Sequence, residues 1–307
     1  MTKRNQKKTI LGVDIGGTKI ACALVSSGKL ASPIYRVKTP KGEKILNEVE
    51  KFYEKFSKKY LISGIGISTA GMVSNSGQIV GSTGNIPGWQ GTKVKETLQK
   101  KYRLPVVVEN DANAAAYAEY QIGQAKGANP LLMITLGTGV GGGVIVNGKL
   151  VRGAHFAGGE IGHIKLSYSK HRHCTCSRYD CFEAYASGNG ILALIKHYFP
   201  NKYKKITTRD LFNLARSKNK DSIFAIRVIE DWHFYIAVGI CNLFQVFDPE
   251  KIVLSGGLSE QIDLNYLKKQ TAKQVLPALE KKVHIEKSVL GNDAGLLGAA
   301  LLASQSL

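Results

Sequence analysis

The chain of 307 residues has a hydrophobic fraction of 44% and a charged fraction of 21%, which suits a globular protein of one large domain or two smaller ones. Its five cysteines are too few for a disulfide-stabilised secreted scaffold. The net charge of +19 would suit a nucleic-acid-binding protein. The lysines are scattered over predicted helix faces, however, so we expect a solvated basic surface and no nucleic-acid partner.

The N-terminal segment MTKRNQKK is basic like the start of a signal peptide, but Asp14 and Lys19 interrupt the apolar run that follows it. The longest uncharged run of aromatic and aliphatic residues, Phe234 to Phe247, is too short to cross a bilayer and predicts a buried helix. These features predict a cytoplasmic protein that has no membrane partner.

Short apolar runs alternate with amphipathic segments in the first part of the chain. Apolar residues at helical spacing predict helices at 43–56 and 93–102. The alanine-rich segment 111–125 predicts another helix, with Asn110 or Asp111 as its cap. The apolar runs between these segments predict strands at 9–15, 19–25, 62–68 and 104–109.

The pattern restarts at residue 131 with a strand, a glycine turn, a second strand and an Asn147-Gly148 hairpin turn. Strands are expected after it at 251–257 and 283–289. Helices are expected from about Glu183, at 222–247, at 264–276 and at 294–303.

Both halves open with a hairpin whose turn is rich in glycine, at Asp14–Lys19 and at Gly137–Gly143, which suggests a weak internal duplication. We expect a small α/β domain at 1–111 and a large α/β domain at 112–293. The last helix, at about 294–307, is expected to return to the small domain.

Glycine turns follow apolar strands in DIGGTK, LGTGVGGG and LSGG. Without a Cβ in the way, successive backbone N–H groups can form a concave phosphate site. One such turn would usually be only a tight turn, but their recurrence favours phosphate binding. The candidate phosphate-binding residues are Gly16, Gly17, Thr18, Lys19, Gly137, Thr138, Gly139, Gly256 and Gly257.

Gly137, Gly139 and Gly142 also satisfy G-x-G-x-x-G, the dinucleotide fingerprint. That fingerprint needs a helix directly after the glycines, whereas VIVNGKLV predicts a β-hairpin. We therefore exclude a nicotinamide-dependent dehydrogenase.

The segment VVVENDANAAA places Glu109, Asn110 and Asp111 at the C-terminal end of a predicted strand, where open α/β sheets bind ligands. Asp111 is equally compatible with a plain helix cap. The functional alternative is a carboxylate that orients a substrate hydroxyl for phosphoryl transfer.

Three cysteines, Cys174, Cys176 and Cys181, gather within a short segment of a chain expected to be cytoplasmic. Three thiolates and one histidine would make a closed tetrahedral zinc site, which is usually structural. Spacing alone does not select the histidine among His163, His171 and His173. Unliganded thiols are the alternative.

DIGGTK, ENDANAAA, LGTGVGGG, GGEIGH followed by C-x-C-x4-CFE, and SGG in this order resemble the ROK family, from about residue 10 to the C-terminus. That family contains bacterial sugar kinases and sugar-responsive repressors. The resemblance implies an actin-like (ribonuclease H-like) α/β fold with two domains around a cleft. It also implies a kinase that uses ATP and Mg²⁺ to phosphorylate a hexose on its primary 6-hydroxyl.

The resemblance assigns the catalytic base to Asp111 and a structural zinc ion to His163 and the three cysteines. One ring nitrogen of His163 would hold the metal while the other faces the sugar. For Trp89, simple packing and sugar stacking are equally compatible. The residues implied to contact the sugar are Ser68, Gly71, Asn85, Asn110, Asp111, Glu160, His163 and Glu183.

The chain departs from the family's C-x-C-G-x-x-G-C motif, because Ser177 and Asp180 replace its two glycines. Aspartate tolerates a left-handed backbone fairly well and serine less so. The departure leaves the loop path open, but it removes no metal ligand. A basic segment, KHRH, lies in the gap between His163 and Cys174.

Glucose is the first expected substrate, with N-acetylmannosamine or N-acetylglucosamine as the alternative. A sugar-responsive regulator is disfavoured, because a DNA-binding domain would need many tens of residues before Asp14. A catalytically inactive sugar-binding protein is disfavoured because every expected acidic position is filled. Family relatives suggest a homodimer or homotetramer.

Overall fold

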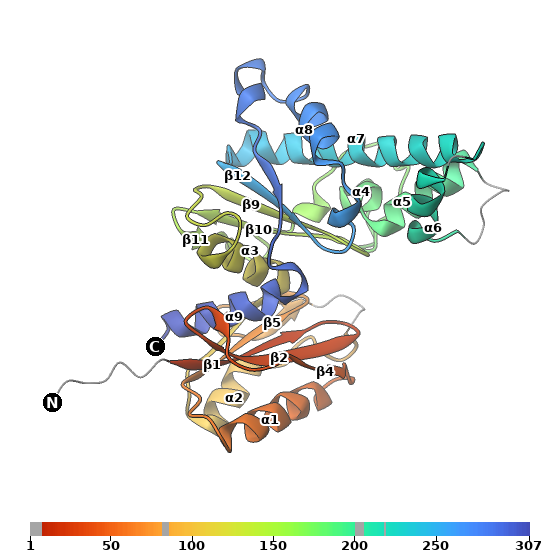
Figure 1. Cartoon of the computed structure of the whole chain (residues 1–307). Coiled ribbons are helices and arrows are strands. Elements are labelled where there is room, and N and C mark those ends of the chain that lie inside the picture. The colour runs from red at the N-terminus through yellow and green to blue at the C-terminus, as the bar shows by residue number, and fades with distance from the viewer. Residues whose placement is uncertain (1–7, 82–85, 200–205, 218) are drawn as a thin grey trace. The chain divides into compact units, whose positions relative to one another are not determined.

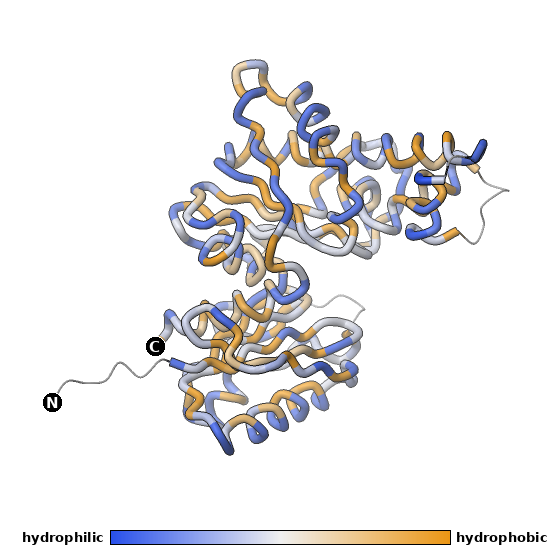
Figure 2. The backbone as a smooth tube through the Cα atoms, in the orientation of Figure 1, coloured by the Kyte–Doolittle hydropathy of each residue, from blue (hydrophilic) through white to orange (hydrophobic). Residues whose placement is uncertain are grey.

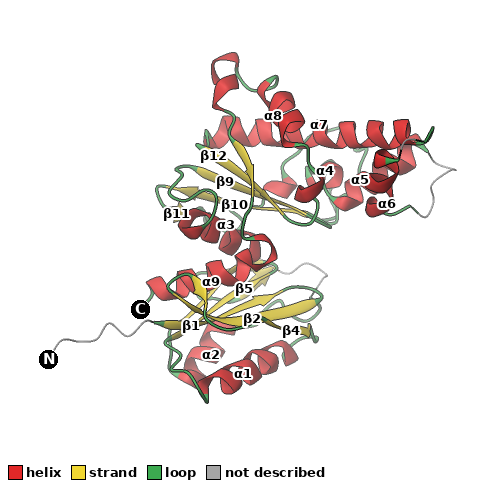
Figure 3. Ribbon diagram, in the orientation of Figure 1, coloured by secondary structure: helices red, strands yellow, loops and turns green. Residues whose placement is uncertain are grey.

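The computed structural model describes residues 8–81, 86–199, 206–217 and 219–307 and divides into two compact units. The first unit consists of Met1–Lys126, Leu150–Gly158 and Val289–Leu307. The second unit consists of Gly127–Lys149 and Gly159–Ser288. Each unit contains its own sheet (Figure 3).

The sheet of the first unit has the strand order β3-β2-β1-β5-β8, with β4 also paired to β2. β1 and β2 are antiparallel, whereas β1, β5 and β8 run parallel to one another. Its strands are β1 (Thr9–Ile15), β2 (Lys19–Ser26), β3 (Lys29–Leu30), β4 (Tyr35–Lys38), β5 (Gly64–Thr69) and β8 (Val106–Asn110). A separate pair is formed by β6 (Met72–Val73) and β7 (Ile79–Gly81).

Helices α1 (Lys44–Ser57) and α2 (Val94–Tyr102) cover one face of this sheet, and α9 (Ala294–Gln305) covers the other (Figure 1). The buried residues of α1 recur at helical spacing, so one side of the helix is apolar and the other is polar (Figure 2). These buried residues are Ile45, Leu46, Val49, Phe52 and Phe56.

Helix α3 (Asp111–Ile122) packs on α9 within the first unit. The two helices meet so closely that a Cβ at Gly298 would lie 1.7 Å from the carbonyl oxygen of Ala114. The first unit therefore extends to Lys126, past the boundary predicted near Asp111. The difference arises because small residues on both helices let their backbones approach, a tertiary contact that local periodicity does not encode.

The sheet of the second unit has the strand order β11-β10-β9-β12-β13. β9 and β10 are antiparallel, whereas β12 runs parallel to both β9 and β13. Asn147 and Gly148 both have positive φ, as their predicted hairpin turn requires. The strands are β9 (Leu131–Leu136), β10 (Val140–Val146), β11 (Lys149–Leu150), β12 (Lys251–Ser255) and β13 (Ile285–Lys287).

Helix α7 (Ser222–Phe247) coincides with the predicted long helix and contacts α4 (Glu183–Ala186), α5 (Gly188–Tyr198), α6 (Thr208–Arg216) and α8 (Leu264–Ala272). Its buried Trp232 donates a hydrogen bond from Nε1 to the carbonyl oxygen of Ala186 at 2.7 Å. Helix α8 ends before the predicted Leu276. Short 3-10 segments complete the described structure at Ile161–His163, Ser259–Gln261, Pro277–Lys282 and Gly291–Asp293.

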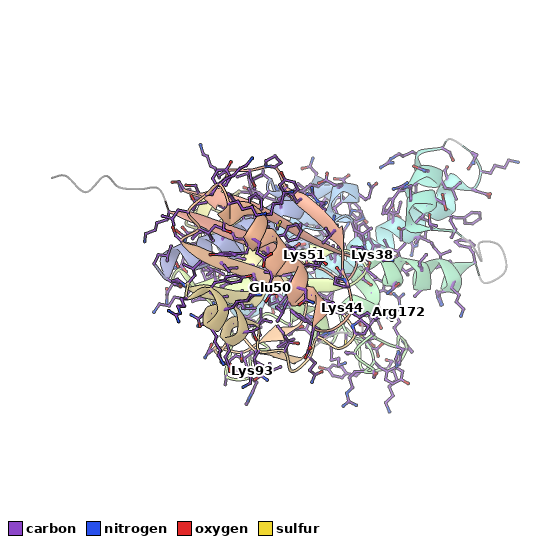
Figure 4. The ribbon with its side chains drawn as sticks, turned by 90° about the horizontal axis from the view of Figure 1, so that it is seen from below. Lys38, Lys44, Glu50, Lys51, Lys93 and Arg172 are labelled. Carbon is purple, nitrogen blue, oxygen red and sulfur yellow. The ribbon has the colours of Figure 1, made fainter. Side chains whose placement is uncertain are left out.

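The basic surface predicted from the composition is present on the first unit, where Lys38, Lys44, Lys51 and Lys93 are exposed (Figure 4). Two of them form ion pairs along the same stretch of chain, Lys51 with Glu48 at 2.7 Å and Lys93 with Glu96 at 3.1 Å. Exposed pairs of this kind contribute little to stability. Within the described residues, no helix is both long and apolar enough to cross a membrane.

Candidate active site

Asp111 is the first residue of α3, directly after the end of β8. Asn110 before it has an extended backbone, and its Oδ1 accepts hydrogen bonds from the N–H groups of Ala112 at 2.9 Å and Asn113 at 3.1 Å. Asn110 is therefore the N-cap. Its Nδ2 donates to the carbonyl oxygen of Gly71 at 3.1 Å, which joins two predicted site residues. The half-buried Asp111 is thus held at a sheet edge by a neighbour that does the capping.

Glu109 stabilises this strand end through an ion pair and hydrogen bonds. Its carboxylate is almost fully buried and pairs with Arg152 through Nε at 2.7 Å and Nη2 at 2.6 Å. The other oxygen accepts from the Asn110 N–H at 3.0 Å and from Asn113 Nδ2 at 3.1 Å. Both guanidinium nitrogens contact the same oxygen, Oε2, and such charge-assisted hydrogen bonds are stronger than neutral ones. Arg152 was not predicted from the sequence, although a glutamate that ends an apolar strand signals the need for a cation.

The first glycine turn joins β1 to β2. The N–H of Gly16 donates to the carbonyl oxygen of Lys19 at 3.0 Å, and the Thr39 hydroxyl donates to the Gly16 carbonyl oxygen at 2.6 Å. Gly17 and Thr18 are exposed at the tip of the turn. These contacts hold the turn closed from the inside and leave its outer side open to an anion.

Asp14 lies just before this turn and was not among the site residues predicted from the sequence. Burial raises the pKa of its carboxyl above the ordinary value, while the hydrogen bond from Ser68 opposes that shift and the nearby Asp293 adds to it. The Ser68 hydroxyl donates to Asp14 Oδ1 at 2.6 Å, and Ser68 has no exposed surface. This arrangement suggests that Ser68 orients Asp14. It does not favour the direct contact with a sugar that was predicted for Ser68. Carboxylate oxygens such as those of Asp14 and Asp293 are ligands that Mg²⁺ prefers.

Trp89 is fully buried, and its Nε1 donates to the Thr69 hydroxyl at 2.9 Å. The indole is therefore packed inside the first unit, which decides between packing and sugar stacking in favour of packing. The predicted sugar contact Asn85 lies outside the described residues.

The cysteine loop lies in the second unit. His163, Cys174, Cys176 and Cys181 each offer one ligand atom, and these atoms all lie within 4.8 Å of one another. Cys176 Sγ is 3.7 Å from Cys181 Sγ, and Cys174 Sγ is 3.8 Å from His163 Nδ1. Zinc–sulfur bonds of about 2.3 Å in a tetrahedron give ligand separations of about 3.8 Å, so the cluster fits zinc. Neither His171 nor His173 belongs to it, so the structure selects His163 among the three candidates.

The thiols of this cluster differ in acidity. Burial raises the pKa of Cys174 to about 12. Burial alone would also raise the pKa of Cys176, but hydrogen bonds from the Arg178 backbone and the neighbouring thiols hold it below the ordinary value. Lys165 Nζ lies 3.1 Å from Cys181 Sγ, where an ammonium can offset thiolate charge. All five cysteines are free thiols in this structure.

His163 presents its two ring nitrogens to different neighbours. Nδ1 faces Cys174, whereas Nε2 lies 3.8 Å from Glu160 Oε2. Both side chains are partly exposed, at 37% for His163 and 41% for Glu160. One side of the imidazole is thus available to a metal, and the other shares an accessible polar edge with a carboxylate.

Glu183 is buried and engaged on both oxygens. Oε2 accepts from the Val140 N–H at 3.0 Å, and Oε1 accepts from the Thr175 hydroxyl. A Cβ at Gly139 would lie 2.4 Å from Oε2, so this glycine makes room for the carboxylate. Glu183 therefore connects the second glycine turn to the cysteine loop. The predicted sugar contact would have to use the lone pairs that these bonds leave.

A cavity of about 620 Å³ in the second unit brings Gly137, Thr138 and Gly257 together. The starts of α5 and α6 also line it, through Gly188 with Asn189 and through Thr208 with Arg209. Helix N-termini favour anions. Its volume lies in the range of small-molecule pockets.

The charge of this cavity is one-sided. Arg209 and Arg216 of α6 both line it, and no acidic residue is among its described lining residues. Arg216 Nη2 donates to Gln261 Oε1 at 2.6 Å, which orients the guanidinium. The cavity therefore suits an anion of nucleotide size. The α6 arginines were not predicted from the sequence, because a short capped basic helix resembles any solvated helix.

Comparisons with known proteins identify the family to which this site belongs. The sequence model of the ROK family matches residues 10–306. A glucokinase of Halalkalibacterium halodurans is 32% identical, over 96% of this chain and 94% of its own length. An N-acetyl-D-glucosamine kinase of Vibrio cholerae is 30% identical, over 95% of this chain and 98% of its own length.

Among solved structures, a ROK family glucokinase from Streptomyces griseus in complex with glucose and AMPPNP is 30% identical, with a TM-score of 0.78. The superposition covers 97% of this chain and 99% of that chain. The predicted actin-like α/β fold class is thereby confirmed. With a family match that spans almost the whole sequence, the chain belongs to the ROK family.

Proposed function

We propose that this protein is an ATP-dependent hexokinase that phosphorylates the primary 6-hydroxyl of a hexose, with glucose as its first substrate. The similarity to a glucokinase over nearly the full length of both chains supports this proposal. So does the similarity to the glucokinase that was solved in complex with glucose and AMPPNP. The observation that carries it is Asp111, a carboxylate at a sheet edge with the helix cap supplied by Asn110.

In this proposal, Asp111 accepts the proton of the sugar's primary hydroxyl as that oxygen attacks the terminal phosphorus of ATP, the bond from that phosphorus to the bridging oxygen breaks, and ADP leaves. Asn110 keeps the first turn of α3 in place by capping it and by holding Gly71. Glu160 and the Nε2 edge of His163 offer hydrogen bonds to sugar hydroxyls. Glu183 shapes the second glycine turn and contributes to the sugar only with its remaining lone pairs.

ATP is proposed to bind in the cavity of the second unit, where Gly137, Thr138 and Gly257 supply backbone and the α6 arginines supply positive charge. The turn at Gly16–Lys19 is proposed as a further phosphate contact. Mg²⁺, when bound, neutralises charge on the phosphates, and Asp14 with Asp293 offers oxygen ligands for it. Asp14 would hold such an ion in a fixed direction because Ser68 orients it.

The Cys₃His cluster is proposed to hold a structural zinc ion. Zinc would fix the loop that contains Thr175 and, through it, the carboxylate of Glu183. The donor set and its spacing support this assignment.

An N-acetylated hexose is the second candidate, because an N-acetyl-D-glucosamine kinase is 30% identical over nearly the whole chain. Discrimination between such sugars depends on a few hydrogen bonds to hydroxyl or acetamido groups.

The deciding experiment is a coupled ADP-release assay with ATP and Mg²⁺ over glucose, mannose, fructose, N-acetylglucosamine and N-acetylmannosamine. We expect the highest kcat/KM with glucose. A higher value with an N-acetylated sugar would replace glucose by the second candidate. No turnover with any hexose would contradict the kinase proposal.

The remaining expectations become proposals of the same kind. A cytoplasmic location suits an enzyme that uses ATP, and light scattering during chromatography would test the proposed dimer or tetramer. A regulator of transcription is the remote alternative. Filter binding to duplex DNA across a salt series tests it, because only specific binding persists at high salt.

A further inference from the structure

We propose that Asp180 is a positioning residue that holds the cysteine loop in its ligand-bearing shape even without the metal ion. The inference rests on the proposed metal centre and concerns a position where the chain departs from the family motif. It assigns to the Asp180 carboxylate a set of hydrogen bonds that a glycine at this position could not make.

Asp180 occupies the position of a motif glycine and has a φ of 56°, in the left-handed region that favours glycine. Ser177, at the other motif glycine, also has positive φ, of 61°. The two side chains differ in their surroundings. Ser177 is exposed, whereas Asp180 is 1% exposed. A carboxylate is rarely this buried unless its oxygens have partners.

The carboxylate of Asp180 accepts hydrogen bonds from two separate parts of the structure. The backbone N–H of Arg172 donates to Oδ1 at 2.9 Å, and that of His171 donates to Oδ2 at 3.3 Å. The Tyr185 hydroxyl on α4 donates to Oδ1 at 2.7 Å. Asp180 thus connects the basic KHRH segment to the helix that begins with Glu183.

Backbone hydrogen bonds of the same residue continue this connection. The N–H of Asp180 donates to the carbonyl oxygen of Arg172 at 2.8 Å, and its carbonyl oxygen accepts from the N–H of Leu166 at 2.9 Å. The cysteine-bearing segment between Arg172 and Asp180 is therefore closed at its base by protein contacts alone. A glycine at 180 would keep only the backbone part of this closure.

Arg172, labelled in Figure 4, extends the contact to the helices. Its guanidinium lies 4.3 Å from the centre of the Tyr185 ring and 5.0 Å from that of Tyr235 on α7. Stacking of this kind adds to the packing around a desolvated cation. Tyr185 is consequently held both by the Arg172 guanidinium and by the Asp180 carboxylate.

The consequence is a loop that stays in place when the metal leaves. Cys174 and Cys176 lie inside the closed segment, and Cys181 directly follows Asp180. In a loop with glycine at 180, the metal would be the main cross-link, as it is in small zinc domains. Here the carboxylate network supplies a second cross-link.

Limited trypsin digestion tests this inference, because Lys165, Lys170, Arg172 and Arg178 place cleavage sites in and beside the loop. Wild type and Asp180→Gly would be digested with zinc and after zinc removal by a chelator, with zinc content measured in each sample. For metal-free wild type we expect loop cleavage within about twofold of the zinc-loaded rate. For metal-free Asp180→Gly we expect cleavage at least about tenfold faster, reversed by returning zinc.

Ser177→Gly is the matched control, because it restores the other motif glycine without removing buried hydrogen bonds. It should behave like wild type. Tyr185→Phe removes one hydroxyl from the network, and we expect it to lie between wild type and Asp180→Gly. If Asp180→Gly does not fold, Tyr185→Phe decides: metal-free cleavage equal to that of wild type overturns the proposal.

Equal metal-free cleavage of wild type and Asp180→Gly would also overturn the proposal. If wild type takes up no zinc, the metal-centre proposal fails by itself. The Asp180→Gly comparison still tests the network in that case, since the contacts of Asp180 do not involve the metal. The two failures are therefore distinguishable.

Discussion

The sheets of the two units share one strand order but are surrounded by different side chains. In the first, β2-β1-β5-β8 is an antiparallel hairpin followed by two parallel strands, and in the second β10-β9-β12-β13 repeats that order. Each hairpin carries a glycine turn, Gly16–Lys19 in one and Gly137–Gly139 in the other. The internal duplication suggested by the sequence is therefore present in the topology.

The difference lies in what surrounds each turn. Asp14, with its raised pKa, and Asp293 lie near the first turn, whereas the second borders a cavity with two arginines and no described acidic lining residue. The repeated hairpin supplies backbone N–H groups in both units. The carboxylate of Asp14 comes from the hairpin strand β1 itself, whereas the arginines beside the second turn come from α6, outside the hairpin.

The largest effect on activity is expected from substitution of Asp111 in the first unit. Asp111→Asn should lower kcat by about 10²- to 10⁴-fold, because it removes the proposed general base. The temperature of unfolding should stay close to that of wild type, since Asn110 provides the cap. Asp263→Asn, at the start of α8 in the second unit, is the control, and it should keep full activity. Near-normal turnover by Asp111→Asn would end the assignment of the base.

Alanine substitutions at two adjacent glycines of the second unit should have different effects, one on stability and the other on nucleotide binding. A Cβ at Gly256 would lie 2.3 Å from the carbonyl oxygen of Leu136, and φ there is +88°. Gly256→Ala should cost about 1–3 kcal/mol of unfolding free energy. A Cβ at Gly257 would meet no heavy atom within 4 Å, and Gly257 lines the cavity, so Gly257→Ala should raise the KM for ATP and leave stability unchanged.

Urea unfolding and ATP titrations measure both quantities for this pair. A normal KM for ATP in Gly257→Ala would place the nucleotide elsewhere.

Substitution of Asp14 should increase stability but decrease activity. Because burial raises its folded-state pKa, the protonated form is favoured by folding, and stability is lost as pH rises through that raised pKa. Asp14→Asn should therefore raise the unfolding temperature at neutral pH in Mg²⁺-free buffer while lowering activity. The gain should vanish at a pH below the ordinary carboxyl pKa of 3.8, where Asp14 is protonated in both states. A gain that is independent of pH would contradict this account.

The smallest effect concerns the cysteine loop. Ser177 has φ of 61°, so Ser177→Gly should relieve backbone strain and add up to about 1 kcal/mol of stability. Ser169→Gly, at an exposed loop position with ordinary φ, should lower stability by a few tenths of a kcal/mol instead. Differential scanning calorimetry of the two zinc-loaded variants would measure the contrast. A loss of stability in Ser177→Gly would show that the turn does not strain the serine.

The sequence predicted those parts of the site whose signal is local. Asp111 follows a β-branched run and opens an alanine-rich helix, so its place at a strand end was predictable. The three cysteines were predictable from their spacing as a candidate metal cluster, and the structure brings them together. The choice of His163 over His171 and His173 rested on the family resemblance. In the structure, His163 is the histidine that lies close to the three thiols.

Other site features depend on partners far apart in the chain. Ser68 orients Asp14 across two neighbouring strands, and Arg152 pairs with Glu109. Helix α3 packs on α9, which begins at residue 294, and both belong to the first unit, whereas the sequence placed α3 in the large domain. No periodicity relates such residues, because periodicity reports only the face that a segment buries.

By itself, then, the sequence determined the main strands and helices in their order, the glycine turns, the thiol cluster and the place of the proposed catalytic carboxylate at a strand end. Each of these is set by residues within a few positions of one another. Only the tertiary structure decided which histidine joins the thiols, which side chains give each turn its charge, and what Asp180 holds. Those outcomes are distances between segments, and packing of the whole unit fixes them.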